Sequence, residues 1–185
     1  MPRTGESGFV PHWFTMALLL AGALGIVLAI AIPSFMRWRQ YEREKAAIAD
    51  MQTLQRAMAG YRDANGGFYD SQLACLTRRG RGCIPNRTLP PEALIEESLA
   101  AAGPRHGYRF SLLPGPPPET LPPTSSPTSV ISFCYTATPE GPADERRAYP
   151  RSLAVDDTGR TCFAGAGEPI PCVEGRLTSD CRTLR

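Results

Sequence analysis

The stretch Trp13–Met36, WFTMALLLAGALGIVLAIAIPSFM, decides how this chain is organised. Its 24 residues include no Asp, Glu, Lys or Arg. At a rise of 1.5 Å per residue, a helix of this length extends about 36 Å, which is enough to cross a hydrocarbon core of about 30 Å. We therefore expect residues 13–36 to span a membrane as one helix. Pro33 removes a helix hydrogen bond and predicts a kink near Ala29.

More polar segments flank the expected span. Residues 1–12 are short and polar, and we expect them to form a leader; no small-x-small site closes the apolar run, so an ordinary cleaved secretory signal is not indicated. Residues 37–65 are predicted to continue the helix as an amphipathic half, ending at the turn-forming Asn65-Gly66-Gly67. Its apolar side chains recur at helical spacings: Trp38, Tyr41, Ile48, Met51, Leu54, Met58 and Tyr61.

Cysteine usage indicates the compartment of the remaining domain, residues 66–185. Six cysteines in so small a region, none of them in a C-x-x-C pair, favour an oxidising compartment and two or three disulfides. Six cysteines allow 15 pairings, and the sequence does not select one of them. Three candidates are Cys75 with Cys83, Cys134 with Cys162 across the sheet, and Cys172 with Cys181 in the tail.

The distribution of Lys and Arg opposes an extracytoplasmic domain. Arg37, Arg39, Arg43 and Lys45 follow the span and only Arg3 precedes it, so the positive-inside rule places the domain in the cytoplasm. We give the cysteines more weight. The expectation is therefore a single-pass membrane protein whose C-terminal domain lies outside the cytoplasm.

The pattern of residues 66–185 predicts a small sheet with a long loop. Pro90–Ala102 begins with proline and acidic residues and is predicted to form a short helix. Residues 114–129 contain seven prolines among serines and threonines, which predicts an extended loop that interrupts the sheet. Alternating apolar residues predict strands around residues 108–112, 131–135, 152–155 and 160–164, with a turn at 156–159 between the last two.

Several of these segments together resemble a bacterial type IV pilin or pseudopilin. They are LGIVLAIAIPSFMRW, the continuation ending in GYRDANGGFY, and the later GYRFSLLP, CYTATPEG and AVDDTGR. Gly25 and Pro33 stand at the spacing of the family's helix-softening glycine and proline. The resemblance implies an α+β, pilin-like fold, with a long N-terminal helix packed on a small antiparallel sheet. It also implies that the chain leaves the inner membrane for a cell-surface filament. The implied partners are other pilin subunits through the N-terminal helix, the inner-membrane assembly machinery and membrane lipid.

The N-terminal region departs from the family pattern. Members are normally cut after a glycine, which leaves an aromatic first residue and a glutamate at the fifth mature position. Counting back from Pro33 places the first mature residue at His12 and the fifth at Met16, so the glutamate is absent. Gly8-Phe9 resembles a processing site, but a cut there would start the mature chain at Phe9, three residues before His12. Because some members that initiate or cap the filament lack this glutamate, the resemblance favours a minor subunit.

Cationic residues gather between the first two cysteines. Arg78, Arg79 and Arg81 lie there, and Arg87 follows just beyond. They form either a solvated surface loop or an anion-binding tip for DNA or acidic polysaccharide. Three phosphate contacts would give a log–log salt slope of only about −2 to −3, so many copies along a filament would be needed for tight binding.

The sequence does not predict an enzyme or a bound cofactor. His12 and His106 have no companions that suggest a catalytic triad, and no G-x-S-x-G, H-E-x-x-H or phosphate-loop motif occurs. Asp156 and Asp157, near Glu168, are calcium candidates, although turn formation also accounts for both aspartates.

Two classes of function remain. One is a minor pilin or pseudopilin that assembles into or caps an extracellular filament for adhesion, motility, secretion or DNA uptake. The alternative is a non-polymerising, membrane-anchored extracellular binding domain that uses the arginine loop or the proline-rich loop as its contact surface. The mature N-terminus and association with filaments distinguish the two.

Overall fold

The computed structural model describes residues 12–78, 82–85, 89–91, 94–101, 103–140, 151–165, 167–179 and 181–183. Over these residues the fold is α+β, with one long N-terminal helix, an antiparallel sheet and three disulfide bonds. The chain divides into two compact units, residues 1–39 and 40–185, and each is described by itself.

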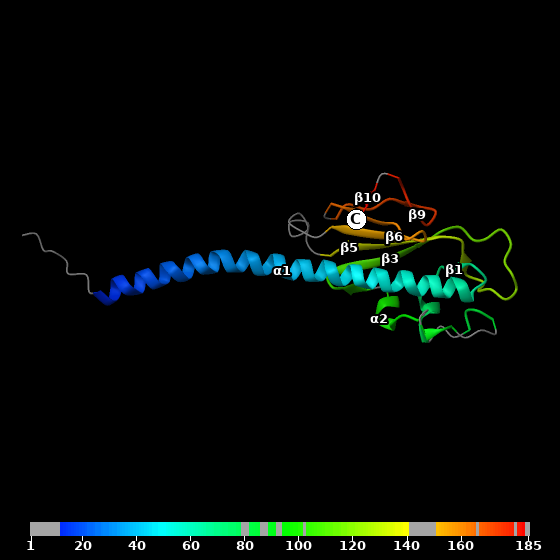
Figure 1. The fold of residues 1–185 in the computed structure, drawn as a ribbon, viewed down its shortest axis with the longest axis horizontal. Helices are drawn as coiled ribbons and strands as arrows, with labels where there is room; N and C mark the ends of the chain where they lie inside the picture. Colours follow the sequence, from blue (N-terminus) through cyan, green and yellow to red (C-terminus); the bar gives the residue numbers. More distant parts are fainter. Residues whose placement is uncertain are drawn as a thin grey trace, which may run out of the picture. The chain divides into compact units, whose positions relative to one another are not determined.

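Helix α1, His12–Ala64, contains the apolar run (Figure 1). It is long and apolar enough to cross a membrane, and every residue from 12 to 39 is exposed. The helix continues through Pro33. One turn earlier, the carbonyl oxygen of Ile30 accepts a 2.8 Å hydrogen bond from the Ser34 hydroxyl. The kink near Ala29 stays a prediction.

The part of α1 that belongs to the second unit buries one face. Met51, Leu54, Met58 and Tyr61 are buried, as the predicted stripe requires. Two members of that stripe differ from the prediction, because Trp38 and Tyr41 are 56% and 65% exposed. The fully buried side chains of α1 begin at Ala47.

The helix ends where the sequence predicts. Ala64 is its last residue, and Gly66 takes a φ of +68°, a value that glycine adopts without strain. The Gly67 amide donates to the carbonyl oxygen of Arg62 at 2.9 Å, which satisfies a carbonyl of the last turn.

A six-stranded antiparallel sheet forms the centre of the second unit, in the order β10-β7-β6-β5-β3-β2. Strands β3, β5, β6 and β7 confirm the four strand predictions, with small shifts of their ends. The bounds are β2 Pro104–Arg105, β3 Tyr108–Pro114, β5 Phe133–Pro139, β6 Ser152–Asp156, β7 Thr161–Ala164 and β10 Arg182–Thr183. The other strands in the described residues form two short pairs: β1 Tyr69–Asp70 with β4 Ser129–Val130, and β8 Cys172–Val173 with β9 Arg176–Leu177.

The second predicted strand begins later than its apolar alternation indicates. Ile131 lies outside β5: its amide donates to the Pro116 carbonyl oxygen just after β4, and its side chain is 44% exposed. Within β5, Cys134 is as fully buried as Phe133 and Tyr135. Both faces of this central strand are therefore covered, so the burial does not alternate.

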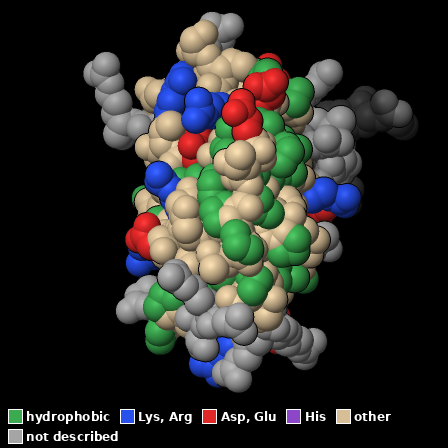
Figure 2. Space-filling view, turned by 90° about the vertical axis from the view of Figure 1, so that its right-hand side faces the viewer, with side chains coloured by type: hydrophobic (Ala, Val, Ile, Leu, Met, Phe, Trp, Pro, Cys, Tyr) green, Lys and Arg blue, Asp and Glu red, His purple; other side chains and the backbone are tan. Residues whose placement is uncertain are grey.

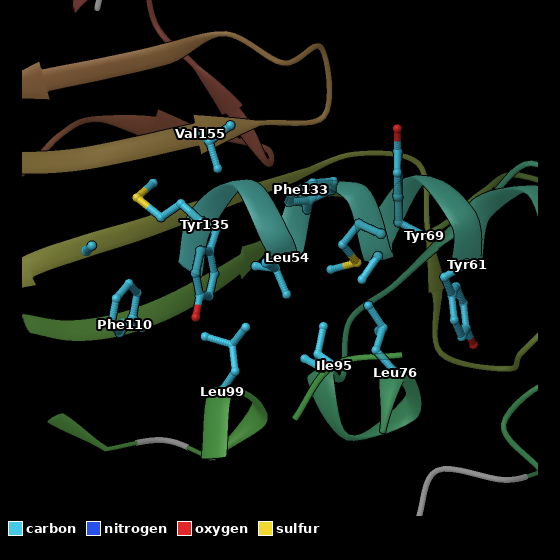
Figure 3. Packing of buried hydrophobic residues seen from close by; sticks show 14 of the residues in the cluster. Leu54, Tyr61, Tyr69, Leu76, Ile95, Leu99, Phe110, Phe133, Tyr135 and Val155 are labelled. Carbon is cyan, nitrogen blue, oxygen red and sulfur yellow. The ribbon is translucent and has the colours of Figure 1, made fainter. Parts of the chain in front are cut away.

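The main core lies between α1 and one face of the sheet. Figure 3 shows Leu54 of α1 between Tyr135 of the sheet and the side chains of Ile95 and Leu99. Leu54 and Tyr135 have no exposed surface, and Ile95 and Leu99 have 6% and 5%. One face of the end of the helix is thus part of the domain core.

The helix predicted for Pro90–Ala102 is much shorter in its described part. Only α2, Glu97–Ala100, is α-helical there. The reason is a tertiary contact, because the Ile95 amide donates to the carbonyl oxygen of Leu76 at 2.8 Å. Leu76 ends the 3₁₀ turn η1, Leu73–Leu76, so the Ile95 amide is bonded to another element and is not part of a helical hydrogen-bond ladder.

The outer face of the sheet is covered by the C-terminal segment. Cys134 of β5 is bonded to Cys172, and Cys162 of β7 is bonded to Cys181. The second core that results contains Cys134, Ala154, Cys162, Ile170 and Leu177.

These two bonds correct the predicted pairings of Cys134 with Cys162 and of Cys172 with Cys181. Strand β6 lies between β5 and β7. Two strand spacings of about 4.8 Å exceed the 7 Å limit for a disulfide's Cα atoms. The first pairing was therefore excluded by the strand order.

Gly115 is expected to tolerate no side chain. A Cβ there would lie 2.0 Å from the Ser132 hydroxyl oxygen and 2.8 Å from the carbonyl oxygen of Glu174. We expect Gly115→Ala to lower the free energy of unfolding by about 1–3 kcal/mol. The measurement is urea unfolding of the full chain in detergent micelles. Gly103→Ala, where a Cβ meets nothing within 4 Å, is the matched control and should leave the midpoint unchanged.

Candidate functional site

The first candidate is the apolar surface of residues 12–39. Its large exposed side chains are Trp13, Phe14, Met16, Leu18, Leu19, Leu20, Leu24, Ile26, Val27, Leu28, Ile30, Ile32, Phe35, Met36 and Trp38. An apolar surface of this extent is unfavourable in water and requires lipid or protein around it. A Cβ at Gly22 or Gly25 would meet nothing within 4 Å, so both glycines leave the backbone open to close approach by a neighbouring helix.

The second candidate is the arginine loop, closed by the disulfide between Cys75 and Cys83. Arg78 is exposed and lies on a hollow of about 330 Å³. Glu96 and Glu97 line the same hollow, so the charge around Arg78 is mixed. Arg79, Arg81 and Arg87, like the processing candidates Gly8 and Phe9, lie outside the described residues.

The calcium candidates form a hydrogen-bonded turn. Asp156 Oδ1 accepts hydrogen bonds from the amides of Thr158 and Arg160 at 3.1 and 3.2 Å, and Oδ2 accepts one from the Leu177 amide at 3.3 Å. Glu168 instead accepts a hydrogen bond from the Gly165 amide at 3.1 Å. Asp156 thus holds the β6–β7 turn and ties the C-terminal segment to it.

Asp157 is the less satisfied of the two aspartates. Burial raises the pKa of its carboxyl, and the charge of Arg176 acts in the opposite direction. The Arg176 guanidinium is 3.7 Å from Asp157 Oδ1, beyond hydrogen-bond distance. Among the described residues, no group of three or more His, Cys, Asp or Glu side chains is placed to hold a metal ion.

A buried polar network fixes the proline-rich loop to the end of α1. Asn65 donates to the Ser129 hydroxyl at 2.9 Å and accepts from the Ser126 amide at 2.7 Å. Asp70 accepts from the hydroxyls of Tyr61 and Thr128, at 2.7 and 2.9 Å. Because these groups are buried, each bond replaces one that water would supply in the unfolded chain. The sequence gives only a weak signal for this network, because Asn65 also serves as a helix stop.

Tyr61 provides a direct test of that network. Burial and the hydrogen bond to Asp70 raise the pKa of its hydroxyl above the usual range, so it stays a donor. We expect Tyr61→Phe to lower the free energy of unfolding by about 1–3 kcal/mol, because the buried Asp70 loses a donor. Tyr135→Phe is the control, since no described residue bonds the Tyr135 hydroxyl, and it should change stability by less than about 1 kcal/mol. Equal losses in urea unfolding would contradict the role assigned to the network.

Ion pairs also join α1 to the rest of the second unit, and the sequence did not reveal them. Glu44 pairs with Arg151, and Asp50 Oδ2 lies 2.7 Å from Arg105 Nε. His106, at the turn between β2 and β3, approaches the same Asp50 oxygen at 3.3 Å. These pairs attach residues 44–50 of α1 to the sheet side of the unit, in the segment where the buried apolar side chains begin.

Apolar side chains gather on the end of the second unit at which the proline-rich loop lies. Figure 1 shows this loop at the end of the unit near β1, and Figure 2 looks onto that end, where apolar side chains occupy the middle of the face. Leu121 in the loop is 41% exposed. Ser126 and Ser129 are hydrogen-bonded to Asn65, so this part of the loop is already held in place. Binding a partner there therefore costs less conformational entropy than binding to a free loop.

Comparison of the chain with family models, with curated proteins and with solved structures finds no match.

Proposed function

We propose that the chain is a minor type IV pilin or pseudopilin subunit that assembles into or caps an extracellular filament. One observation carries the proposal: α1 is embedded in the domain core over Ala47–Tyr61, while residues 12–39 of the same helix expose apolar side chains throughout. A lipid bilayer satisfies that surface before assembly, and apolar helices of other copies satisfy it afterwards.

Met16 supports a minor position in the proposed filament. In the register counted from Pro33, it occupies the place of the family's glutamate. A carboxylate buried in lipid is costly and needs a partner, whereas Met16 is compatible with apolar surroundings. A subunit without that charge is suited to the start or cap of a filament, where one neighbour is missing.

The decisive experiment is intact-mass and N-terminal analysis of protein purified separately from membranes and from sheared surface filaments. The proposal expects a filament-associated form that is cut after Gly8 or nearby. A full-length form found only in membranes would overturn it.

A membrane-anchored binding domain that does not polymerise is the second candidate. The fixed proline-rich loop and the apolar side chains on the same end of the unit favour it, because they offer a preorganised contact surface in a single copy. In this case the loop is the functional part, and the apolar helix acts as an anchor only.

The arginine loop has its own test in either case. We expect the triple substitution of Arg78, Arg79 and Arg81 by Gln to reduce the log–log salt slope of DNA binding by about 2–3, because each lost phosphate contact removes about 0.9. Fluorescence anisotropy with labelled duplex DNA over a range of salt concentrations measures the slope. Arg56→Gln is the control, because it makes the same type of substitution at an exposed position of α1 outside the loop. An unchanged slope in the triple variant would leave the loop as a solvated surface.

A further inference from the structure

Two aromatic pairs mark the ends of the apolar run in the unit formed by residues 1–39. Trp13 and Phe14 lie edge to face, with ring centroids 6.0 Å apart, and Phe35 and Trp38 have centroids 5.9 Å apart. All four side chains are exposed. Aromatic side chains, and tryptophan above all, favour the boundary between lipid and water, where the ring is in an apolar environment and the indole N–H is hydrated.

The separation of the pairs matches the thickness of a bilayer. Along an α-helix, Phe14 and Phe35 are about 32 Å apart, and Trp13 and Trp38 are about 38 Å apart. The hydrocarbon core is about 30 Å thick, and the bilayer with its headgroups is about 40–45 Å thick. The phenylalanines therefore match the two edges of the hydrocarbon, and the tryptophans match the two headgroup layers.

Within residues 12–39, Lys, Arg, Asp and Glu occur at one of these two ends. Among the described residues of this unit, Arg37 and Arg39 are the only Lys, Arg, Asp or Glu residues, and they flank Trp38 in the sequence. The Arg39 guanidinium lies 5.8 Å from the centroid of the Phe35 ring. Helical side chains point toward the N-terminus, so this contact holds the cation beside the apolar run. Within residues 12–39 no carboxylate accompanies the two arginines, and the first one along the helix is Glu42, three residues after Arg39.

We propose that Phe35–Arg39 is a binding site for the acidic headgroups of phospholipids in the leaflet at the C-terminal end of the membrane span. The two guanidinium groups bind the phosphates, each able to donate two parallel hydrogen bonds, while the two rings fill the boundary beneath them. The Trp13–Phe14 end has rings but no Lys or Arg within residues 12–36, so a cation and a ring are not placed together in this described part of the helix. The inference rests on the membrane anchoring in the proposed function and is independent of filament assembly.

The chain's two tryptophans are built-in reporters for this site. The full-length Trp13→Phe variant, which retains Trp38, and the Trp38→Phe variant, which retains Trp13, are reconstituted into phosphatidylcholine vesicles. Quenching by phosphatidylglycerol with brominated acyl chains is compared with quenching by brominated phosphatidylcholine. The ratio of the two gives the lipid preference around each tryptophan. The test variant adds Arg37→Gln and Arg39→Gln to Trp13→Phe, and the control adds Arg56→Gln instead.

The expected result is a preference for the acidic lipid at Trp38 that exceeds the preference at Trp13 and depends on Arg37 and Arg39. This preference should fall about five-fold for each of Arg37 and Arg39 removed, stay unchanged in the Arg56→Gln control, and weaken in high salt. Equal quenching by both lipids at Trp38 would overturn the site. Inorganic phosphate that removes the preference more than chloride at the same ionic strength would also overturn it, by assigning the arginines to a free anion.

The same tryptophans distinguish a failure of membrane anchoring from a failure of the lipid-binding site. If aqueous iodide quenches both tryptophans as fully as in the unfolded chain, the apolar run is not inserted, and both the site and the anchor are wrong. Absence of the chain from sheared filaments, together with an intact lipid preference at Trp38, would overturn the filament proposal alone.

Discussion

Leu54→Ala is expected to lower the free energy of unfolding by about 3–5 kcal/mol, a larger loss than we expect from Gly115→Ala or Tyr61→Phe. Leu54 has no exposed surface. It lies where α1, the sheet and the Ile95–Leu99 segment meet (Figure 3), so the cavity left by the shortened side chain is enclosed on all these sides. Surroundings that are fixed by several elements cannot collapse to fill the space.

The measurement is urea unfolding of the full chain in detergent micelles, followed by near-ultraviolet circular dichroism of the buried tyrosines. Leu113→Ala is the matched control, because Leu113 is 39% exposed at the end of β3, and it should cost about 0.5 kcal/mol or less. A loss at Leu54 no greater than that at Leu113 would show that the helix is not part of the domain core.

Removal of the disulfide between Cys134 and Cys172 is the second prediction of large effect. The double variant Cys134→Ala/Cys172→Ala is expected to lose about 4 kcal/mol of stability, because this bond closes a loop with a sequence separation of 38. It also joins β5 to the C-terminal segment that covers the outer face of the sheet, so this cover should loosen first.

The variant Cys75→Ala/Cys83→Ala is the comparison, since its bond closes a separation of only 8 and should cost about 2.5 kcal/mol. Urea midpoints give the order of the two losses. Peptide mapping of the unreduced protein identifies the bonded pairs. Fragments linking Cys134 to Cys162 would contradict the strand order of the sheet, whatever the stabilities.

The parts of the fold that could be predicted are those in which the local pattern and the tertiary environment agree. Apolar length identified the helix, and the spacing of Met51, Leu54 and Met58 identified its buried face, because the sheet covers the side that the periodicity selects. Gly66 and the turn before Gly159 were predictable from backbone preference alone.

The parts that could not be predicted depend on which elements become neighbours. The pairing of Cys134 with Cys172 follows from the position of β6 between β5 and β7, which no local pattern contains. The hydrogen bond from Ile95 to Leu76 overrides the helical character of the surrounding residues. The roles of Asn65 and Asp70 depend on a loop that begins some 45 residues or more later in the sequence. Of the arginine loop, the structure describes Arg78 alone among the four arginines.

The way in which the C-terminal segment is fastened also determines the order of covalent events during synthesis. A chain made from its N-terminus completes Cys75 and Cys83 close together, so their bond can form early. Cys134 and Cys162 emerge next, before either Cys172 or Cys181 exists, and for that interval their available partners are each other and the earlier cysteines. An oxidant that acts at once therefore traps incorrect bonds, which must then be exchanged through mixed disulfides. The final pairing requires either delayed oxidation or a catalyst of disulfide exchange.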